Sequence, residues 1–461
     1  MSMKDNKFGV WLWNERYLMI LLFVGVLLRI LLMLFSQPLL TDDSSDYLVM
    51  ADWIRQLDFT DYAAKRLPAY PFLMILAGMK LRVIWAIQSC MGLVGLLFLY
   101  DLARRMRLSP RWSFIVCVPV LIGLQFLFLE TAILSETMAI FLILLIMHLL
   151  QKIVMEKNLK IPLYALSGLL IAVCILTRPL FIVLAPVLLL VLAVNEWWLV
   201  KWSWGSCSRL LAFVSPLVFL VGGWILFNSI VAGYMGLSSN MYSGLLNHCG
   251  LYAELARPEY RDLAEIYIRH REESYGAIQA RGGSLTVVQA SAVPEMMQAR
   301  GLSHKDLIPV LAAFSTSLIF DHPSLYARGV FWAWIDYWRV PLVWYPELVV
   351  SPCIRQGIGF MWIPIKLLWL LLGLGVVMVS IVYIGCLFRV RMTSAHLYLL
   401  SMLAVLWITS LLQAMLESNS ENARYAIPLQ PLLPLLLAGM VVFLRKKSLR
   451  TIVQSEQTLG I

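Results

Sequence analysis

The chain has 461 residues, of which 61% are apolar and only 14% are charged, and its formal net charge is +10. Soluble globular domains are about 25% charged, so this composition excludes a soluble enzyme and indicates a polytopic membrane protein. A basic net charge is also typical of nucleic-acid-binding proteins, but here the basic residues follow membrane topology. We therefore expect membrane lipids and no nucleic acid among the partners.

Apolar runs long enough to cross a bilayer recur along the chain. The first run lacks the short core and cleavage site of a removable signal peptide, so we expect it to remain as a signal-anchor. The runs cover residues 17–37, 83–102, 112–129, 134–151, 161–176, 179–195, 209–233, 359–387, 396–416 and 425–444. The sequence therefore predicts an all-α polytopic membrane protein with about ten transmembrane helices.

Basic residues decide the orientation of these runs. The connections on the side of the amino terminus carry Arg104, Arg105, Arg107, Arg111, Lys152, Lys157, Lys160, Lys201, Arg209, Arg389, Arg391 and a basic tail. By the positive-inside rule this side is cytoplasmic, and both termini lie there. Fusing the fifth and sixth runs into one span would break this pattern. Because the chain has no Asn-x-Ser/Thr acceptor, we expect a bacterial inner (plasma) membrane.

The pattern divides the chain into three parts. Residues 1–230 form a transmembrane module whose first outward loop, 38–82, is expected to hold amphipathic helices. Residues 231–357 form one large outward loop, and residues 358–461 form the C-terminal transmembrane helices. Opposite charges at helical spacing from Pro258 to Tyr275, and a Trp-rich stretch from Leu325 to Tyr345, predict a helical periplasmic lid resting on the membrane.

Polar residues lie at the ends of several spans, all on the outward face in the expected topology. They are Asp42, Asp43, Arg66, Glu136, Arg178, Arg424 and Tyr425. A carboxylate can accept the proton of an attacking hydroxyl, and arginine side chains hold phosphate through paired charge-assisted hydrogen bonds. Ionisable groups at membrane depth are usually functional. The pattern predicts one extracytoplasmic site for a polar substrate carried on a lipid phosphate.

Five short motifs in order resemble the membrane glycosyltransferases of the GT-C superfamily, in particular the family 39 branch with the protein mannosyltransferases and the aminoarabinose transferase of lipid A. The motifs are Asp43-Ser44-x-x-Tyr47-x-x-x-Ala51, Arg66-x-Pro68-x-Tyr70-Pro71, Leu134-Ser135-Glu136-Thr137, Leu176-Thr177-Arg178-Pro179 and Arg424-Tyr425-x-x-Pro428. The resemblance covers most of residues 17–195 and the last two spans. In loop 231–357 it is limited to Asp321-His322-Pro323-x-x-Tyr326.

The resemblance implies a GT-C fold and an inverting transfer of sugar from a polyprenyl-phosphate donor to a lipid glycan, a polysaccharide or a protein. In that family a carboxylate of the first outward loop is the catalytic base, which carries over onto Asp43. The family often has Asp-Glu where this chain has Asp43-Ser44, so the second acid is Asp42 or Asp46, or is absent. Glu136 is a further candidate for the site, and Arg66, Arg178, Arg424 and Tyr425 are candidates for binding the donor phosphate.

Other interpretations stay open from the sequence alone. Asp43 also fits the N-cap of a helix beginning near Ser44, and Asp46 fits the solvated face of an amphipathic helix over 44–57. Asp43 and Glu136 together are candidate ligands for a divalent metal ion. A transporter or flippase of lipid-linked sugars, or an O-antigen ligase or polymerase, would share several of these features, although transporters usually show internal repeats that are not evident here.

Overall fold

The computed structural model describes residues 15–60, 62–156, 160–280, 285–339, 351–388, 392–417 and 422–444. Within these ranges the chain is almost entirely helical and forms no β-strand. A single isolated parallel bridge joins Leu39 to Ala132. The prediction of an all-α polytopic membrane protein is confirmed.

The helices follow the order of the apolar runs. In chain order they are α2 (Arg16–Phe35), α3 (Asp42–Gln56), α4 (Ala69–Leu76), α5 (Leu81–Arg105), α6 (Pro110–Leu121), α7 (Leu124–Thr131), α8 (Glu136–Met155), α9 (Ile161–Thr177), α10 (Leu184–Val194), α11 (Trp204–Leu217), α12 (Gly223–Val231), α13 (Asn240–Cys249), α14 (Arg261–Glu273), α15 (Tyr275–Ala280), α16 (Thr286–Arg300), α17 (His304–Asp321), α18 (Pro323–Trp338), α19 (Pro352–Leu387), α20 (Ser394–Leu416) and α21 (Asn422–Ala426). A further apolar helix covers Leu432–Leu444.

Among the described residues, seven helices are long and apolar enough to cross a membrane. The pair α6 and α7, bent by 54° at the break between them, makes eight if it counts as one span. Two of the ten predicted runs, at α9 and Leu432–Leu444, form shorter apolar helices. The expected number of ten is therefore not confirmed, because these two helices are shorter than the other spans within the described part of the chain.

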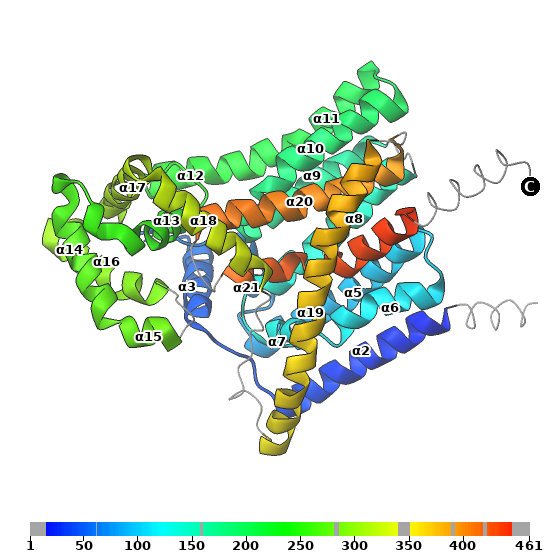
Figure 1. Cartoon of the computed structure of the whole chain (residues 1–461), viewed down its shortest axis with the longest axis horizontal. Helices are drawn as coiled ribbons and strands as arrows, with labels where there is room; N and C mark the ends of the chain where they lie inside the picture. Colours follow the sequence, from blue (N-terminus) through cyan, green and yellow to red (C-terminus); the bar gives the residue numbers. More distant parts are fainter. Residues whose placement is uncertain are drawn as a thin grey trace, which may run out of the picture.

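The span helices form a bundle with α8 at its centre and the lid at one end (Figure 1). Of the apolar window of α8, 78% is buried, against 17% for α2 and 6% for the continuous helical segment Trp204–Val231. A helix that is apolar all round packs in the interior, whereas outer helices leave their apolar side chains to lipid. The start of α2 and the end of Leu432–Leu444 lie at the end opposite the lid (Figure 1).

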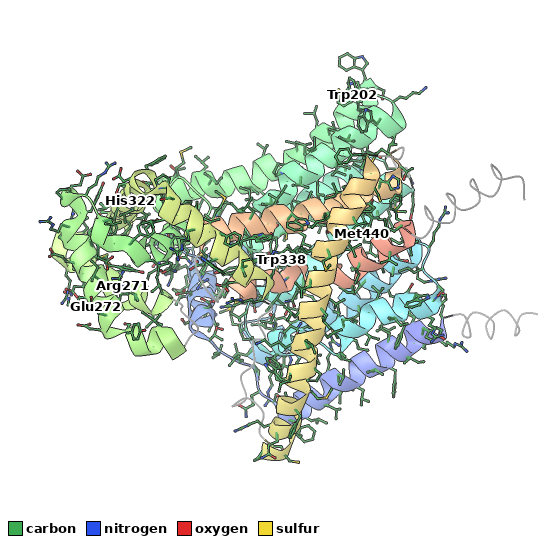
Figure 2. All side chains as sticks on the ribbon, in the orientation of Figure 1. Trp202, Arg271, Glu272, His322, Trp338 and Met440 are labelled. Atoms are coloured by element: carbon green, nitrogen blue, oxygen red, sulfur yellow. The ribbon has the colours of Figure 1, made fainter. Side chains whose placement is uncertain are left out.

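The lid consists of α13 to α18 and has a hydrophobic core of its own. Leu246, Leu263, Tyr267, Val288 and Phe314 meet there, one or two from each of four helices. Arg271 and Glu272 of α14 lie at the far tip of the lid, away from Trp202 at the opposite end of the molecule (Figure 2). The large loop predicted over 231–357 is therefore helical in its described residues.

Two predicted lid segments differ in their bounds from the structure. The charged segment expected from Pro258 begins as a short 3-10 turn, and α14 follows from Arg261. The Trp-rich helix ends at Trp338, and Trp344 lies outside the described residues. The next span, α19, already begins at Pro352, before the boundary expected at 358.

Candidate functional site

Helix α3 presents Asp43 from its first turn. The helix begins at Asp42 with Thr41 as its N-cap, and the Thr41 backbone N–H donates to Ser44 Oγ at 2.9 Å. The alternative that Asp43 caps a helix beginning near Ser44 is therefore wrong, because Thr41 occupies that position. Asp43 lies inside the helix, and its carboxylate is left to contact other elements. Of Asp42 only the backbone is described, so its candidacy as a site acid lies outside the described side chains.

The segment between α7 and α8 holds α3 in place. Leu39 N–H donates to Thr131 O at 2.9 Å, and Ser44 Oγ donates to Ile133 O at 2.9 Å. Tyr47 OH and Ser135 Oγ are hydrogen bonded at 2.9 Å. Because Ser135 directly precedes Glu136, these bonds bring the start of α8 next to the first turn of α3.

A buried glutamine, Gln88 of α5, also holds the segment between α7 and α8. Gln88 Nε2 donates to the carbonyls of Glu130 and Ala132, both at 2.8 Å, and Gln88 Oε1 accepts from Tyr70 OH at 2.8 Å. The Tyr70 ring meets the Tyr47 ring edge to face, with centroids 5.0 Å apart. Buried polar groups that are fully hydrogen bonded fix a unique geometry. The floor of the site is therefore rigid.

Six side chains of alternating charge form one continuous chain of ion pairs. The chain runs Asp46, Arg66, Asp43, Arg424, Glu136, Arg178, and we call it the ion-pair chain. Its successive N–O distances are 2.8 Å, 2.5 Å, 2.9 Å, 2.8 Å and 2.9 Å. Five separate parts of the sequence contribute to it. All the arginines expected to bind phosphate are thus brought together, and each is already paired with a carboxylate.

Two tyrosine rings support the outer guanidinium groups. Arg66 lies over the Tyr47 ring and Arg178 over the Tyr425 ring, each with its guanidinium carbon 5.0 Å from the ring centroid. Such contacts contribute about 0.5–1 kcal/mol each at exposed sites and more when water is excluded. Tyr425, a candidate for binding phosphate, therefore contacts Arg178, another of these candidates.

A pocket of about 640 Å³ opens over the ion-pair chain. Its walls come from the membrane module on one side and from lid helices α13 and α16 on the other. The lining residues are Asp43, Ser45, Asp46, Tyr47, Lys65, Arg66, Arg178, Asn240, Gly244, Asn247, Gln289, Ala290, Val293, Pro294, Glu417, Arg424 and Tyr425. This volume lies within the range of about 300–1,000 Å³ for small-molecule sites.

The electrostatics of the pocket fix the charge of Asp43. Burial raises the pKa of its carboxyl, but the fields of Arg424 and Arg66 and their hydrogen bonds outweigh burial and hold the pKa well below its usual range. Burial lowers the pKa of Arg66, and its neighbours Tyr47, Asp43 and Asp46 more than reverse this and raise it. Both groups are therefore charged at every physiological pH.

Glu136 is the innermost member of the chain and is fully buried. Its Oε1 accepts from both Arg178 and Arg424, whereas its Oε2 has no hydrogen-bond partner among the described residues. A buried oxygen without a donor is costly, so this position calls for an explanation. The uneven use of the two oxygens distinguishes Glu136 from an ordinary buried salt bridge.

Reasoning from the sequence missed the contribution of the lid. Asn247 of α13 donates to Glu417 Oε1 at 2.5 Å, and both line the pocket. Gln289 enters from α16. No motif marks these lid residues, because they meet the membrane module only through tertiary packing. Asp46, a candidate for the second acid that also fits a solvated helix face, contacts both Lys65 and Arg66 through its carboxylate.

The residues present do not fit the divalent metal ion considered for Asp43 and Glu136. Arg424 lies between the two carboxylates and contacts both. An ion placed there would meet fixed cations on several sides, and hard cations need a set of free oxygen ligands. The described residues also contain no group of three or more His, Cys, Asp or Glu side chains arranged to hold a metal.

Comparison with known proteins gives no family for the chain. No model of a known protein family matches it, and no curated protein matches its sequence.

Proposed function

We propose that this protein is a GT-C glycosyltransferase of the family 39 type, which moves a sugar from a polyprenyl-phosphate donor to a lipid glycan, a polysaccharide or a protein. The observation that carries the proposal is the position of Asp43. Its carboxylate lies in a pocket of suitable size, clamped between Arg66 and Arg424, at one end of an apolar helix bundle. An ionised acid and two arginines that could bind phosphate thus share one pocket at the end of the bundle.

Asp43 is the catalytic base in this mechanism. The acceptor hydroxyl gives its proton to a carboxylate oxygen of Asp43 while the hydroxyl oxygen forms a bond to the anomeric carbon. The bond from that carbon to the phosphate oxygen breaks, and polyprenyl phosphate leaves with its electron pair. Since one displacement occurs on one face of the sugar, the anomeric configuration is inverted.

The arginines stabilise the departing phosphate. Arg66 and Arg424 each contact two carboxylates already, so the donor phosphate is a third anion with which each arginine shares its donors. This weakens their hold on Asp43 and raises its pKa toward the range where a carboxylate is an effective base. In this mechanism the donor itself activates the base, because Asp43 becomes basic enough to accept a proton only when the phosphate shares its arginines.

The orientation of the chain supports an extracytoplasmic site. The pocket lies at the lid end, and the start of α2 and the end of Leu432–Leu444 lie at the other end (Figure 1). With the positive-inside distribution of basic residues, both termini are cytoplasmic and the pocket faces the periplasm of a bacterial inner membrane. The lid forms one wall of the pocket and selects the acceptor.

The decisive experiment replaces Asp43 with asparagine in purified protein incubated with a panel of polyprenyl-phosphate sugars. General-base catalysis contributes about 10²–10⁴-fold, so donor-dependent transfer should fall by that factor while donor still binds. The matched control is Asp58→Asn, because Asp58 lies in the same loop and its carboxylate accepts hydrogen bonds from Thr60, outside the pocket. This control should retain wild-type transfer.

Two outcomes would overturn the proposal. If Asp43→Asn transfers sugar at the wild-type rate, Asp43 is not the base. If the wild-type protein carries labelled lipid-linked sugar across vesicle membranes without any transfer, and Asp43→Asn does the same, the protein is a transporter or flippase.

A further inference from the structure

Arg66 lies in the non-helical connection between α3 and α4, so helix geometry does not fix its backbone. Ala64, two residues earlier, is fully buried and has a φ of 53°, in the left-handed region. This conformation costs free energy in a residue other than glycine, and it persists only where the surroundings hold it. The contacts of residues 63–65 therefore decide where the backbone of Arg66 lies.

Two consecutive serines directly before α13, Ser238 and Ser239, hold this connection. Ser239 Oγ donates to Ala63 O at 2.9 Å, and the Ser239 backbone N–H donates to Ala64 O at 2.9 Å. Ser238 Oγ donates to Lys65 O at 2.7 Å. Three consecutive carbonyls are thus paired. Because both serines are buried, water competes little for these bonds, and we call the two residues the serine clamp.

The serine clamp itself has a fixed base. Tyr62 OH donates to Asn228 Oδ1 at 2.6 Å, which joins the connection after α3 to the end of α12. Asn228 Nδ2 donates to the carbonyls of Gly236 and Leu237 at 2.7 Å and 3.1 Å. These two residues directly precede the serine clamp. The last turns of a membrane helix therefore hold both partners of the clamp in one frame.

The serine clamp also meets the lid wall of the pocket over the ion-pair chain. Ser238 Oγ accepts from the backbone N–H of Asn240 at 3.3 Å, and Asn240 lines that pocket. Arg66 lines the same pocket from the membrane module. One hydroxyl group therefore connects the backbone next to Arg66 with the first residue of α13.

The backbone of Arg66 matters most when a donor is bound. Three side chains of α3 hold its guanidinium group, namely the carboxylates of Asp43 and Asp46 and the Tyr47 ring. Under the proposed function the phosphate shares the donors of Arg66, so the hold of the carboxylates weakens. The backbone then decides whether the guanidinium group stays within reach. The Lys65 side chain is 48% exposed on a flexible stem, so its position depends less on its backbone.

We propose that Ser238 and Ser239 are positioning residues for the donor. By fixing the backbone directly before Arg66, they keep its guanidinium group within hydrogen-bond reach of the donor phosphate. In the described part of the chain neither serine lines the pocket, so both act through Arg66. The inference rests on the proposed function for the identity of the phosphate group.

The test compares the binding of polyprenyl phosphate and of the corresponding polyprenol to the full-length protein in detergent micelles. Isothermal titration calorimetry gives a Kd for each lipid, and the ratio of the two reports what the phosphate contributes. The variant Ser238→Ala/Ser239→Ala removes both hydroxyls and keeps the backbone bond to Ala64. The Kd for polyprenyl phosphate should rise about tenfold, because a charge-assisted hydrogen bond is weakened. The Kd for polyprenol should stay unchanged.

The matched control is Ser317→Ala. Ser317 is a buried lid serine whose hydroxyl donates to Phe314 O at 2.8 Å within α17. Its replacement removes a comparable bond and should leave both Kd values unchanged. The single variants Ser238→Ala and Ser239→Ala each remove one side-chain bond to the connection, and each should raise the Kd for polyprenyl phosphate by a smaller factor. They supply the test if the double variant does not fold.

A double-mutant cycle shows whether the serine clamp acts through Arg66. In the Arg66→Gln background the guanidinium group is gone, so removal of both serine hydroxyls should change the Kd for polyprenyl phosphate by less than about twofold. An equal rise in both backgrounds overturns the inference. So does an unchanged Kd in the double serine variant, a parallel rise for polyprenol, or a wild-type protein that binds the two lipids equally.

Transfer assays separate this inference from the proposed function. With a sugar donor, the double serine variant should raise the KM for donor about tenfold and keep kcat, because only the hold on the phosphate is weakened. If the wild type prefers polyprenyl phosphate to polyprenol but transfers no sugar, the proposed function is overturned and the positioning role toward the phosphate stands. If transfer occurs and the variant keeps the wild-type KM, the inference is overturned and the proposed function stands.

Discussion

Two fully buried glutamates show how differently the same type of ion pair is used at the two ends of this molecule. Glu196 is buried and directly precedes Trp197, whose ring centroid is 6.0 Å from that of Trp202. Trp202 lies at the end opposite the lid (Figure 2). Its two oxygens accept from Tyr164 OH at 2.5 Å, from Ser206 Oγ at 2.8 Å and from both Nε and Nη2 of Arg209 at 2.8 Å and 2.6 Å. Each carboxylate oxygen of Glu196 thus accepts two hydrogen bonds, and its one cationic partner is Arg209.

Glu136 is equally buried but is used in another way. Two guanidinium groups contact its Oε1, and its Oε2 lacks a partner among the described residues. Arg424 continues to Asp43, which lines the large pocket. Under the proposed function, the unsaturated chain keeps donors and acceptors for a ligand, whereas the saturated pair at Glu196 holds helices together.

The strongest test of the contrast compares Glu136→Gln with Glu196→Gln. Because Arg178 and Arg424 then lose the carboxylate that orients them, we expect Glu136→Gln to lower transfer about 100-fold. Glu196→Gln leaves Arg209 buried without its anion, so it should cost about 3 kcal/mol of stability and leave the activity of the folded protein unchanged. Thermal unfolding in detergent and the transfer assay measure the two effects. The comparison would fail if both variants lost a similar amount of stability and both kept the wild-type activity.

Replacement of Arg424 with lysine tests whether the guanidinium group, and not its charge alone, is needed between Asp43 and Glu136. A single ammonium group cannot contact Asp43 and Glu136 in the two-sided manner of a guanidinium group, although the charge is kept. We expect the KM for donor to rise about 10-fold, since bidentate phosphate contacts are lost. The same change at the other end, Arg209→Lys, should lower the melting temperature and leave the KM unchanged. An unaltered KM in Arg424→Lys would show that the guanidinium group does not hold the phosphate.

The dependence of stability on pH tests the field around Asp43. The folded-state pKa of Asp43 lies below the unfolded value of about 3.9, so its stabilising contribution is present above that value and is lost as the pH falls through the folded pKa. In Arg66→Gln one of the two cations is gone, and burial then raises the pKa. The loss of stability that Asp43 causes in acid should therefore be smaller in this variant and should end at a higher pH than in the wild type, since its onset is set by the unfolded-state pKa in both proteins. Melting temperatures from about pH 2 to 7 measure this, and coincident profiles would contradict it.

The smallest expected effects come from two tyrosine hydroxyls. Tyr47→Phe removes a neutral hydrogen bond to Ser135 and should cost about 1 kcal/mol, whereas Tyr164→Phe removes one to a carboxylate and should cost about 2 kcal/mol. Only Tyr47→Phe should change the rate of transfer, and by a few fold, because it loosens the contact between α3 and α8. An effect of Tyr164→Phe on transfer would show that the Glu196 end is coupled to the site.

Much of the architecture follows from local patterns. Long apolar runs predict spans because a helix must satisfy its own backbone groups in lipid, and the acidic first loop marks one end of the bundle. The helix expected over 44–57 is observed from Asp42 to Gln56, since Thr41 and Ser44 provide capping chemistry that the sequence shows. The short helices, such as α9, show that an apolar pattern alone does not fix span length.

The sequence by itself determined that this is a helical membrane protein and which ionisable residues end up at span ends, because hydropathy and charge position are local properties. Only the tertiary structure decided how Asp43 and Glu136 share Arg424, and that α13 and α16 of the lid line the pocket. Those relations join residues hundreds of positions apart, and side-chain packing, which no short motif records, sets their distances.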